Sequence, residues 1–230
     1  MAAVLAVELV DGMSMEEPMW SGPREGTRLL LFGFMASVTM VQGIEWELND
    51  GIKLVIVGFD VGEFSENGSD DVEGLDASAA HVANLLSTEP ADIKLGVGGF
   101  SMGAAAALYS AMCFANGRHS NGSPYPINLN VVVGLSGWLP CSRSLKSRIE
   151  GSQEAVRRAA TLPLLLSHGK ADDVVLYKQG QKSAEALAST GFRNLTFETY
   201  NGLGHYTIPD EMADVCKWLT SRLRLTGSRA

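Results

Sequence analysis

Apolar runs alternate with amphipathic segments along the chain from about residue 92 onward. Short runs rich in apolar and β-branched residues predict buried strands, and the Ala-rich or mixed segments between them predict helices. The expected strands cover 93–98, 129–135, 162–166 and 195–199, and the expected helices cover 102–114, 179–189 and 209–223. Because the strands are apolar almost throughout, the alternation is typical of a mostly parallel sheet with helices on both faces.

Proline and glycine mark several expected boundaries in this part of the chain. Pro163 stands near the start of a strand, where its missing N–H is tolerated. Pro209 stands in the first turn of the last helix, and Asp210 and Glu211 beside it complement the helix dipole. Gly191 follows the preceding helix as its expected C-terminal cap. These signals define where the elements begin and end.

The first sixty residues are less regular. Residues 29–34 and 52–57 are strand candidates, and the type of element at residues 44–48 is ambiguous. A helix is expected over 70–86, with one apolar side made of Val72, Leu75, Ala79, Val82, Leu85 and Leu86. The chain has no internal repeat and no low-complexity linker, so residues 1–230 are predicted to form a single α/β domain.

Composition and charge narrow the classes of function. Apolar residues make up 46% of the chain and charged residues 19%, which is enough apolar material for a sizeable core. The formal net charge is −8, and no basic stripe is visible. A nucleic acid partner is therefore not expected, because such a partner requires clustered lysine and arginine.

The sequence shows no targeting signal that we can identify, and its cysteine pattern is typical of a reducing compartment; both favour the cytoplasm. No apolar run approaches the roughly 20 residues that a membrane-spanning helix needs. The first twelve residues have no basic start and contain Glu8 and Asp11, so a signal peptide is not expected. Cys113, Cys141 and Cys216 are odd in number and widely spaced, which predicts free thiols in a reducing compartment and no metal motif.

The sequence GFSMG at 99–103 places Ser101 between an expected strand and an expected helix. The flanking glycines permit a tight turn that lifts the serine hydroxyl to the top of the sheet. The N-terminus of the following helix would aim backbone N–H groups at the same point and favour an oxyanion there. This context predicts a nucleophilic serine. The alternative is a turn of small residues in which Ser101 only caps the helix.

A serine nucleophile needs a base, and the sequence has four histidines. His205 follows the last strand in a Gly-rich loop, at the edge where open α/β sheets place their sites. His168 follows the third of the expected strands and also lies near that edge. His81, within a helix, and His119, within a polar loop, are interpreted as surface or packing residues. His205 is therefore the predicted base.

The loop after His168 offers two acids, Asp172 and Asp173. Either one completes the order serine, acid, histidine, which is the order found in α/β-hydrolases and not in other serine hydrolases. We select Asp172, which would hold the imidazole tautomer of His205 and stabilise its cation. Spacing alone does not separate the two acids, and a role in the turn or as a cap is the alternative for Asp172.

Several longer stretches resemble the acyl-protein thioesterases of plants, in the carboxylesterase/phospholipase group of α/β-hydrolases. The resemblance covers about residues 58–225, and residues 1–57 diverge from it. The matching stretches are DDVEGLDASAAHVANLL (70–86), GVGGFSMGAAAALYS (96–110), VGLSGWLP (133–140), PLLLSHGKADDVV (163–175) and GLGHYTIPDEMADVCKWL (202–219). It implies an α/β-hydrolase fold and hydrolysis of acyl esters or thioesters, including fatty-acyl cysteines on proteins, in the cytoplasm and without a cofactor.

The resemblance also assigns roles to single residues. It implies Ser101 as the nucleophile, His205 as the base, and Asp172 rather than Asp173 as the acid. The backbone N–H of Met102 would be one donor to the oxyanion. The segment SGWLP is similar to one that lies beside the acyl site in the family. Two candidates for lining that site follow, with ordinary loop packing as the alternative for both: Trp138 and Leu139.

The family's early Leu-His-Gly-x-Gly-Asp loop, which supplies a second oxyanion N–H, is altered in this chain. Residues 31–36 read Leu-Phe-Gly-Phe-Met-Ala. The backbone N–H of Phe34 would still donate if the loop keeps its shape. Met35 stands where the family has a glycine, and a positive φ at that position would be strained. Because the loss of one oxyanion donor costs about 10²–10³-fold in kcat, activity is expected to fall if this loop is distorted.

A second departure follows the strand candidate at 52–57. The family carries a longer Pro- and Gly-rich insert there, whereas Val57 runs directly into Gly58 in this chain. Since the insert covers part of the active site in the family, its loss is expected to open the pocket. The short N-terminal part also leaves open whether all N-terminal edge strands of the family are present.

Three functional hypotheses follow. The first is a working serine hydrolase of acyl esters or thioesters. The second is a weakly active or inactive relative that binds an acyl chain or small ligand, since a fold does not by itself imply a function. The third is a shortened product with little stability of its own. The complete serine, acid and histidine set favours the first hypothesis, and the altered loop at 31–36 favours the second.

Overall fold

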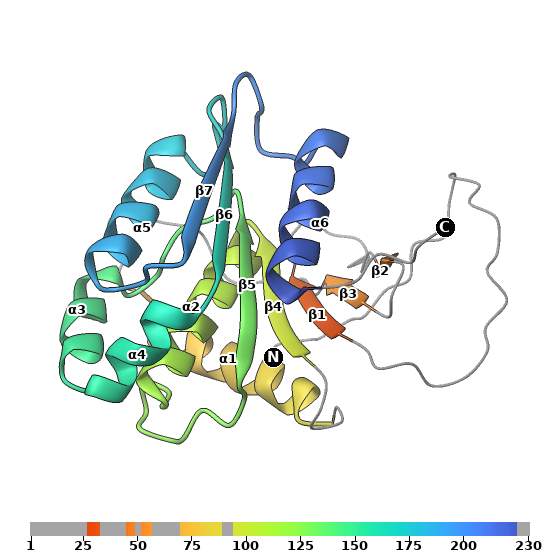
Figure 1. The fold of residues 1–230 in the computed structure, drawn as a ribbon. Helices are drawn as coiled ribbons and strands as arrows, with labels where there is room; N and C mark the ends of the chain where they lie inside the picture. The colour runs from red at the N-terminus through yellow and green to blue at the C-terminus, as the bar shows by residue number, and fades with distance from the viewer. Residues whose placement is uncertain (1–26, 33–44, 49–51, 57–69, 89–93, 225–230) are drawn as a thin grey trace, which may run out of the picture.

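The computed structural model describes residues 27–32, 45–48, 52–56, 70–88 and 94–224. Within these residues, one sheet has the strand order β2-β3-β1-β4-β5-β6-β7 (Figure 1). Neighbouring strands are parallel except β2 and β3, which are antiparallel. The strands are β1 (Thr27–Phe32), β2 (Glu45–Leu48), β3 (Ile52–Ile56), β4 (Lys94–Phe100), β5 (Leu129–Leu135), β6 (Leu164–Gly169) and β7 (Leu195–Tyr200).

Six helices are described together with this sheet. They are α1 (Val72–Leu86), α2 (Met102–Asn116), α3 (Ser142–Glu150), α4 (Gln153–Thr161), α5 (Tyr177–Ser189) and α6 (Pro209–Leu223). The predicted mostly parallel α/β architecture is confirmed, and the ambiguous segment at 44–48 is the antiparallel strand β2. Among the described helices, none combines the length and apolar character that crossing a membrane requires.

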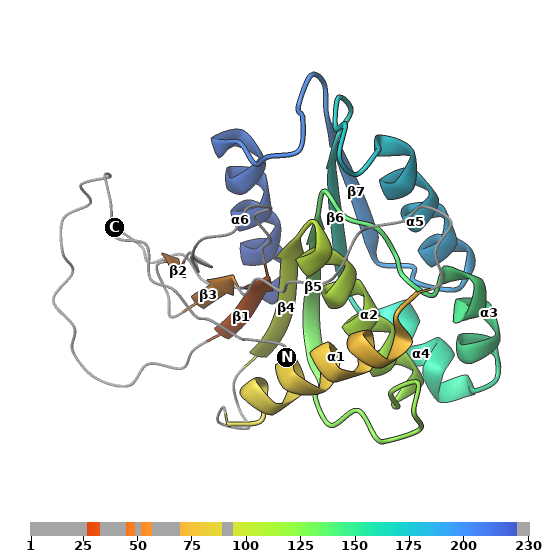
Figure 2. The ribbon, with the colours of Figure 1, turned by 180° about the vertical axis from the view of Figure 1, so that it is seen from behind.

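The side chains of β5 explain how both faces of the sheet are covered. Successive strand residues point to opposite faces. Val131 and Val133 therefore face α6 and pack with Leu219, whereas Val132 faces the other way into a larger apolar cluster. That cluster contains residues of α1, α2, α3, α4 and α5. Figures 1 and 2 show α6 on the opposite side of the sheet from α1 and α2.

Helix α2 is the central helix of the larger cluster. Its residues from Gly103 to Ala115 are all buried. A helix that is apolar on all sides belongs in a protein core, and the many alanines let it lie close to its neighbours. It begins directly after Ser101 and ends at Gly117, which has a positive φ of 73° as a C-terminal cap. The position of α2 therefore fixes both the serine and the segment that follows Asn116.

Two helices, α3 and α4, were not predicted. Each has nine residues and only two buried positions, Leu145 and Ile149 in α3 and Ala155 and Ala159 in α4. A single apolar pair at i, i+4 is too little periodicity to indicate a helix. The predicted apolar side of α1 is correct for Ala79, Val82 and Leu86, but Asp76 is also buried on that helix, and Val72 is exposed.

Candidate active site

Ser101 stands at the corner between β4 and α2, as the sequence predicts. Its φ of 56° and ψ of −119° are unusual for a residue other than glycine. Its N–H donates to the carbonyl of Leu135 at 2.8 Å, which ties the corner to the end of β5. The Ser101 side chain makes no capping hydrogen bond to α2. The backbone is strained and the hydroxyl is not used as a cap, a combination that is typical of a functional position.

Gly137 allows the loop after β5 to pass against this corner. A Cβ atom at this position would lie 2.4 Å from the Cβ of Ala104 and 2.7 Å from the carbonyl oxygen of Ser101. Both distances are shorter than real Cβ contacts, and Ala104 and Ser101 are fixed by the first turn of α2. Only glycine therefore permits this close approach.

Asp172 lies in the loop after β6 with both carboxylate oxygens engaged. Oδ1 accepts the N–H groups of Val174 at 3.0 Å and Val175 at 2.9 Å. Oδ2 lies 2.8 Å from Nδ1 of His205, and the side chain is fully buried. Asp173 is exposed. Of the two acids that spacing left open, Asp172 is the one that the structure brings to the histidine.

The loops that carry Asp172 and His205 touch each other through backbone atoms. The N–H of Ala171 donates to the carbonyl of Leu203 at 3.0 Å. A Cβ atom on Gly169 would lie 2.2 Å from the same carbonyl oxygen, so a side chain there would push the loops apart. The glycine thus sets the distance between the acid and the histidine.

His205 connects the acid to the serine. Its Nδ1 faces Asp172, and its Nε2 lies 3.0 Å from Oγ of Ser101. The ring lies against Phe100, with centroids 4.8 Å apart and an angle of 45° between the planes. The side chain is 14% exposed, so one edge of the imidazole reaches solvent. A continuous hydrogen-bonded line therefore runs from a buried carboxylate to a serine hydroxyl.

His168 contacts the loop that carries Asp172. Its ring lies 2.7 Å from the carbonyl of Val175 through Nε2, and the same nitrogen lies 3.5 Å from Oδ2 of Asp172. Burial lowers the pKa of His168, although the Val175 carbonyl and the Asp172 charge act in the opposite direction. The neutral ring donates its N–H to the Val175 carbonyl. Gly180 makes room for it, since a Cβ there would lie 2.4 Å from Nδ1.

Four further residues were predicted for the site. Met102 is the first residue of α2, where backbone N–H groups of the first turn lack helical partners. Leu139 is buried in the apolar core, and its N–H donates to Oγ of Ser183 at 2.8 Å. Trp138 beside it is half-buried. Phe34 and the junction after Val57 lie outside the described residues.

Sequence reasoning missed a buried carboxyl in the first turn of α6. Glu211 is fully buried in the first turn of α6, and the hydroxyl of Ser167 donates to its Oε1. Burial raises the pKa of Glu211, although the Ser167 and Ile208 hydrogen bonds act in the opposite direction. The sequence interpretation used Glu211 only as a complement to the helix dipole. The signal that was available is its i, i+4 spacing from Val215 and Leu219, both buried in α6.

The chain is similar to several known proteins. The model of the phospholipase/carboxylesterase family matches residues 54–223. A probable carboxylesterase of rice, Oryza sativa subsp. japonica, is 33% identical over 177 residues, which are 74% of this chain and 60% of the rice protein. Acyl-protein thioesterase 1 of Gibberella zeae is 30% identical over 173 residues, which are 73% of this chain and 65% of that protein. This chain thus covers less than two thirds of the length of these two relatives.

A solved structure gives a closer likeness. The crystal structure of Zea mays acyl-protein thioesterase 2 is 51% identical, covers 89% of this chain and 97% of the maize chain, and has a TM-score of 0.78. The structure of Arabidopsis thaliana SOBER1, at 23% identity and a TM-score of 0.60, shares the fold. On the match over residues 54–223, the chain belongs to the phospholipase/carboxylesterase family of α/β-hydrolases.

Proposed function

We propose that this protein is a serine hydrolase that cleaves acyl esters or thioesters through Ser101, His205 and Asp172. One observation carries the proposal. Oγ of Ser101 lies 3.0 Å from Nε2 of His205, and Nδ1 of that ring lies 2.8 Å from Asp172. The three side chains come from three separate loops, and this arrangement is the one needed to activate a hydroxyl at neutral pH.

The first half of the proposed reaction acylates the serine. Nε2 of His205 takes the proton of Ser101 while Oγ attacks the carbonyl carbon of the substrate. The resulting oxyanion accepts the backbone N–H of Met102, at the positive end of the α2 dipole. The tetrahedral species then collapses, the bond to the leaving alkoxide or thiolate breaks, and the imidazolium of His205 protonates that leaving group. Asp172 stabilises the imidazolium without accepting its proton.

The second half of the reaction releases the acid. His205 takes a proton from a water molecule, and the water oxygen attacks the acyl carbon held on Ser101. Collapse of the second tetrahedral species breaks the bond to Oγ, which recovers its proton from His205. The products are a carboxylic acid and free enzyme. No step needs an electron acceptor or a metal, and we expect none as a cofactor.

Within this reaction class we propose S-acylated proteins as the natural substrates and the cytoplasm as the location. The Gibberella zeae and Zea mays relatives are both named acyl-protein thioesterases, which supports this choice. The three free cysteines are consistent with a reducing compartment. Trp138 and Leu139 stay candidates for contact with the acyl chain, and Phe34 stays the candidate for the second oxyanion donor.

Labelling with a fluorophosphonate probe tests nucleophile activation directly, because the probe reacts only with an activated serine. We expect one equivalent to attach to the wild-type chain and none to Ser101→Ala. An S-acylated peptide and the matched oxygen ester then define the substrate class, with release of free thiol or alcohol as the signal. Equal labelling of the wild type and Ser101→Ala would refute the proposal.

A second candidate function is a binding protein for acyl chains or small ligands. It is favoured by the altered loop at 31–36, where the family's second oxyanion donor stands. The two functions give different results in the same assays. Full probe labelling with no turnover of either ester, together with tight binding of a fatty acid, would favour the binding protein.

A further inference from the structure

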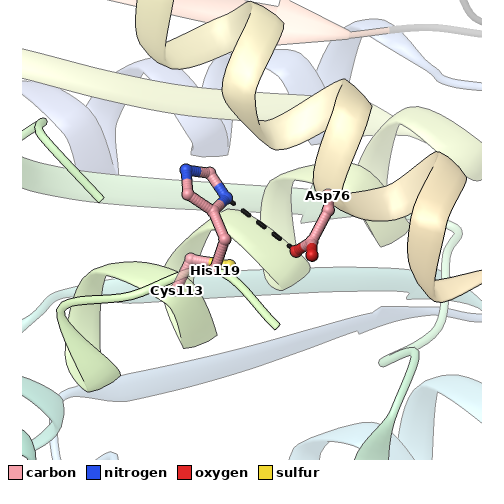
Figure 3. A group of neighbouring side chains, drawn as sticks. All are labelled: Asp76, Cys113 and His119. Carbon is pink, nitrogen blue, oxygen red and sulfur yellow. Dashed lines mark ion pairs between the residues drawn. The ribbon is translucent and has the colours of Figure 1, made fainter. Parts of the chain in front are cut away.

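A second group of chemically active side chains lies at the other end of α2. Asp76 comes from α1, Cys113 from the last turns of α2, and His119 from the segment that follows it (Figure 3). All three are buried, and one ligand atom of each lies within 4.8 Å of the others. Cys113 stands twelve positions after Ser101, or on the order of 18 Å along the helix at 1.5 Å per residue. The group is therefore separate from the candidate active site.

The carboxylate of Asp76 is buried in its ionised form. It accepts the hydroxyl of Tyr109 at 2.6 Å and the N–H groups of Ser120 at 2.9 Å and Asn121 at 2.8 Å. Burial acts to raise the pKa of Asp76, but these hydrogen bonds outweigh it and lower the pKa. Among the described residues, no lysine or arginine lies within ion-pair distance of this carboxylate; its ion-pair contact there is His119. Buried charges are usually paired or coordinate a metal.

The imidazole of His119 presents an unused nitrogen to that carboxylate. The residue is 5% exposed, and its Nδ1 has no hydrogen-bond partner in the described part of the chain. Nδ1 lies 3.9 Å from Oδ1 of Asp76, which is too long for a hydrogen bond. Figure 3 shows this nitrogen directed at the carboxylate. A buried ring nitrogen without a partner is uncommon and calls for a ligand.

Cys113 supplies the third donor. It is 1% exposed, and burial together with the charge of Asp76 raises the pKa of its thiol to about 12. Without a metal the group is therefore a neutral thiol and not a reactive thiolate. A bound divalent cation displaces the thiol proton to solvent, and the two charges of the cation are then balanced by Asp76 and the Cys113 thiolate.

We propose that Asp76, Cys113 and His119 form a zinc(II) site that joins α1, α2 and the segment after α2. One thiolate, one imidazole and one carboxylate are ligands that zinc accepts together, whereas Mg²⁺ and Ca²⁺ prefer oxygen alone. Metal–ligand distances of about 2.0–2.3 Å place tetrahedral ligands about 3.5 Å apart, so binding draws the three atoms together. The three atoms already lie within 4.8 Å of one another, so each pair has to approach by about 1.3 Å or less, and His119, which lies outside the helices, is the ligand expected to move. Water takes the fourth position.

The site would act on stability and not on catalysis. Zinc that binds only the folded chain raises its stability in proportion to the logarithm of the free metal concentration. Because the cluster lies far from Ser101, ester hydrolysis is expected to be the same with and without zinc. A failure of the hydrolase proposal therefore leaves the zinc proposal untouched, and the reverse also holds.

The test uses the full chain after treatment with a chelator. Titration with Zn²⁺, followed by calorimetry and by the melting temperature, is expected to give one ion per chain and a higher melting temperature. Co²⁺ in place of Zn²⁺ is expected to give a near-ultraviolet thiolate-to-cobalt absorption band. In Cys113→Ala and His119→Ala we expect affinity to fall by about 100-fold or more, because even residues behind a ligand cost 10–100-fold. The matched control is Cys216→Ala, a thiol on α6, which is expected to bind like the wild type.

The thiolate band keeps the result decisive even if one variant folds poorly. Cys113→Ala removes only one buried sulfur, and its melting temperature without metal shows whether it is folded. The proposal is wrong if the wild type binds no stoichiometric zinc. It is also wrong if folded Cys113→Ala keeps both the affinity and the cobalt band, since the metal would then sit at another thiol.

Discussion

An aspartate and a histidine lie together near each end of α2, but the two pairs are arranged differently. At the N-terminal end, Asp172 and His205 lie 2.8 Å apart, and the histidine reaches Ser101 with its second nitrogen. Beyond the C-terminal end, Asp76 and His119 lie 3.9 Å apart. Both carboxylates are buried and both accept two backbone N–H groups. The residue types alone therefore do not decide the chemistry.

The difference lies in what else each carboxylate binds. Asp172 keeps Oδ2 for the histidine, so it orients the ring toward a strained serine. Oδ1 of Asp76, which lies 3.9 Å from Nδ1 of His119, already accepts Tyr109 and Ser120, and Nδ1 has no hydrogen-bond partner among the residues that the structure describes. The first arrangement is suited to moving a proton. The second leaves a set of donor atoms that a cation can bring together.

The largest effect is expected when the nucleophile or the base is removed. Ser101→Ala and His205→Ala should each lower kcat by about 10⁵–10⁶-fold, because the two side chains act as one unit. For the same reason the double variant should be no slower than either single one. Turnover of a short-chain nitrophenyl ester measures this, with His119→Gln as the matched control at the other end of α2. A control that loses as much activity as His205→Ala would remove the distinction between the two histidines.

Replacing the acid should have the next largest effect. Asp172→Asn keeps the shape of the side chain but no longer holds His205 in the productive tautomer, and a loss of about 10⁴-fold in kcat is expected. Asp173→Asn is the control, because Asp173 is exposed and is expected to change kcat by less than a factor of about two. Steady-state rates of the two variants at neutral pH decide this. Similar rates for both would show that the acid has been assigned wrongly.

These residues also show what the sequence alone could predict. Ser101 is the residue directly after β4, and His205 lies in the Gly-rich loop after β7, so the predicted strands were enough to select both as candidates. Helix α6 was predicted with its correct bounds, since Pro209 and the following acids mark its start. Asp172 was separated from Asp173 only by the family resemblance. The two residues are neighbours in a loop, and the sequence does not show which of their side chains points toward the histidine.

The features that escaped prediction depend on contacts between distant segments. Asp76 was assigned no role on α1, but it is buried because it holds the backbone at Ser120 and Asn121, 44 and 45 positions away. His119 was interpreted as a surface or packing residue; it is buried, so the surface interpretation was wrong. Nothing in the local pattern of a polar loop indicates that a carboxylate on another helix closes over it.

A moderate effect on stability is expected for Asp76→Asn. The amide keeps one acceptor for Tyr109 but loses the charge that strengthens three hydrogen bonds, so a loss of about 1–3 kcal/mol in unfolding free energy is expected. Because the folded pKa of Asp76 is lowered, its contribution is present above the unfolded pKa and disappears as the pH falls through the folded value. Urea unfolding at neutral and at acidic pH should therefore show a difference between wild type and variant that shrinks in acid. A constant difference would mean that the charge has no part in it.

The smallest effect, on the order of 1 kcal/mol, is expected for Glu211→Gln, which tests the carboxyl buried in the first turn of α6. Since its pKa is raised by burial, the folded chain holds this proton to a higher pH than the unfolded chain does. Stability is therefore lost as the pH rises from the unfolded pKa through the folded one.

The glutamine of Glu211→Gln cannot ionise and still accepts the hydroxyl of Ser167, so the variant should gain stability relative to the wild type as the pH rises. Glu154→Gln, at an exposed position of α4, is the control and should show no such gain, because the lowered pKa of Glu154 gives the opposite slope. Unfolding curves at several pH values between 4 and 8, compared pairwise, measure the effect; parallel curves for wild type and Glu211→Gln would show that the buried acid ionises as it does in the unfolded chain.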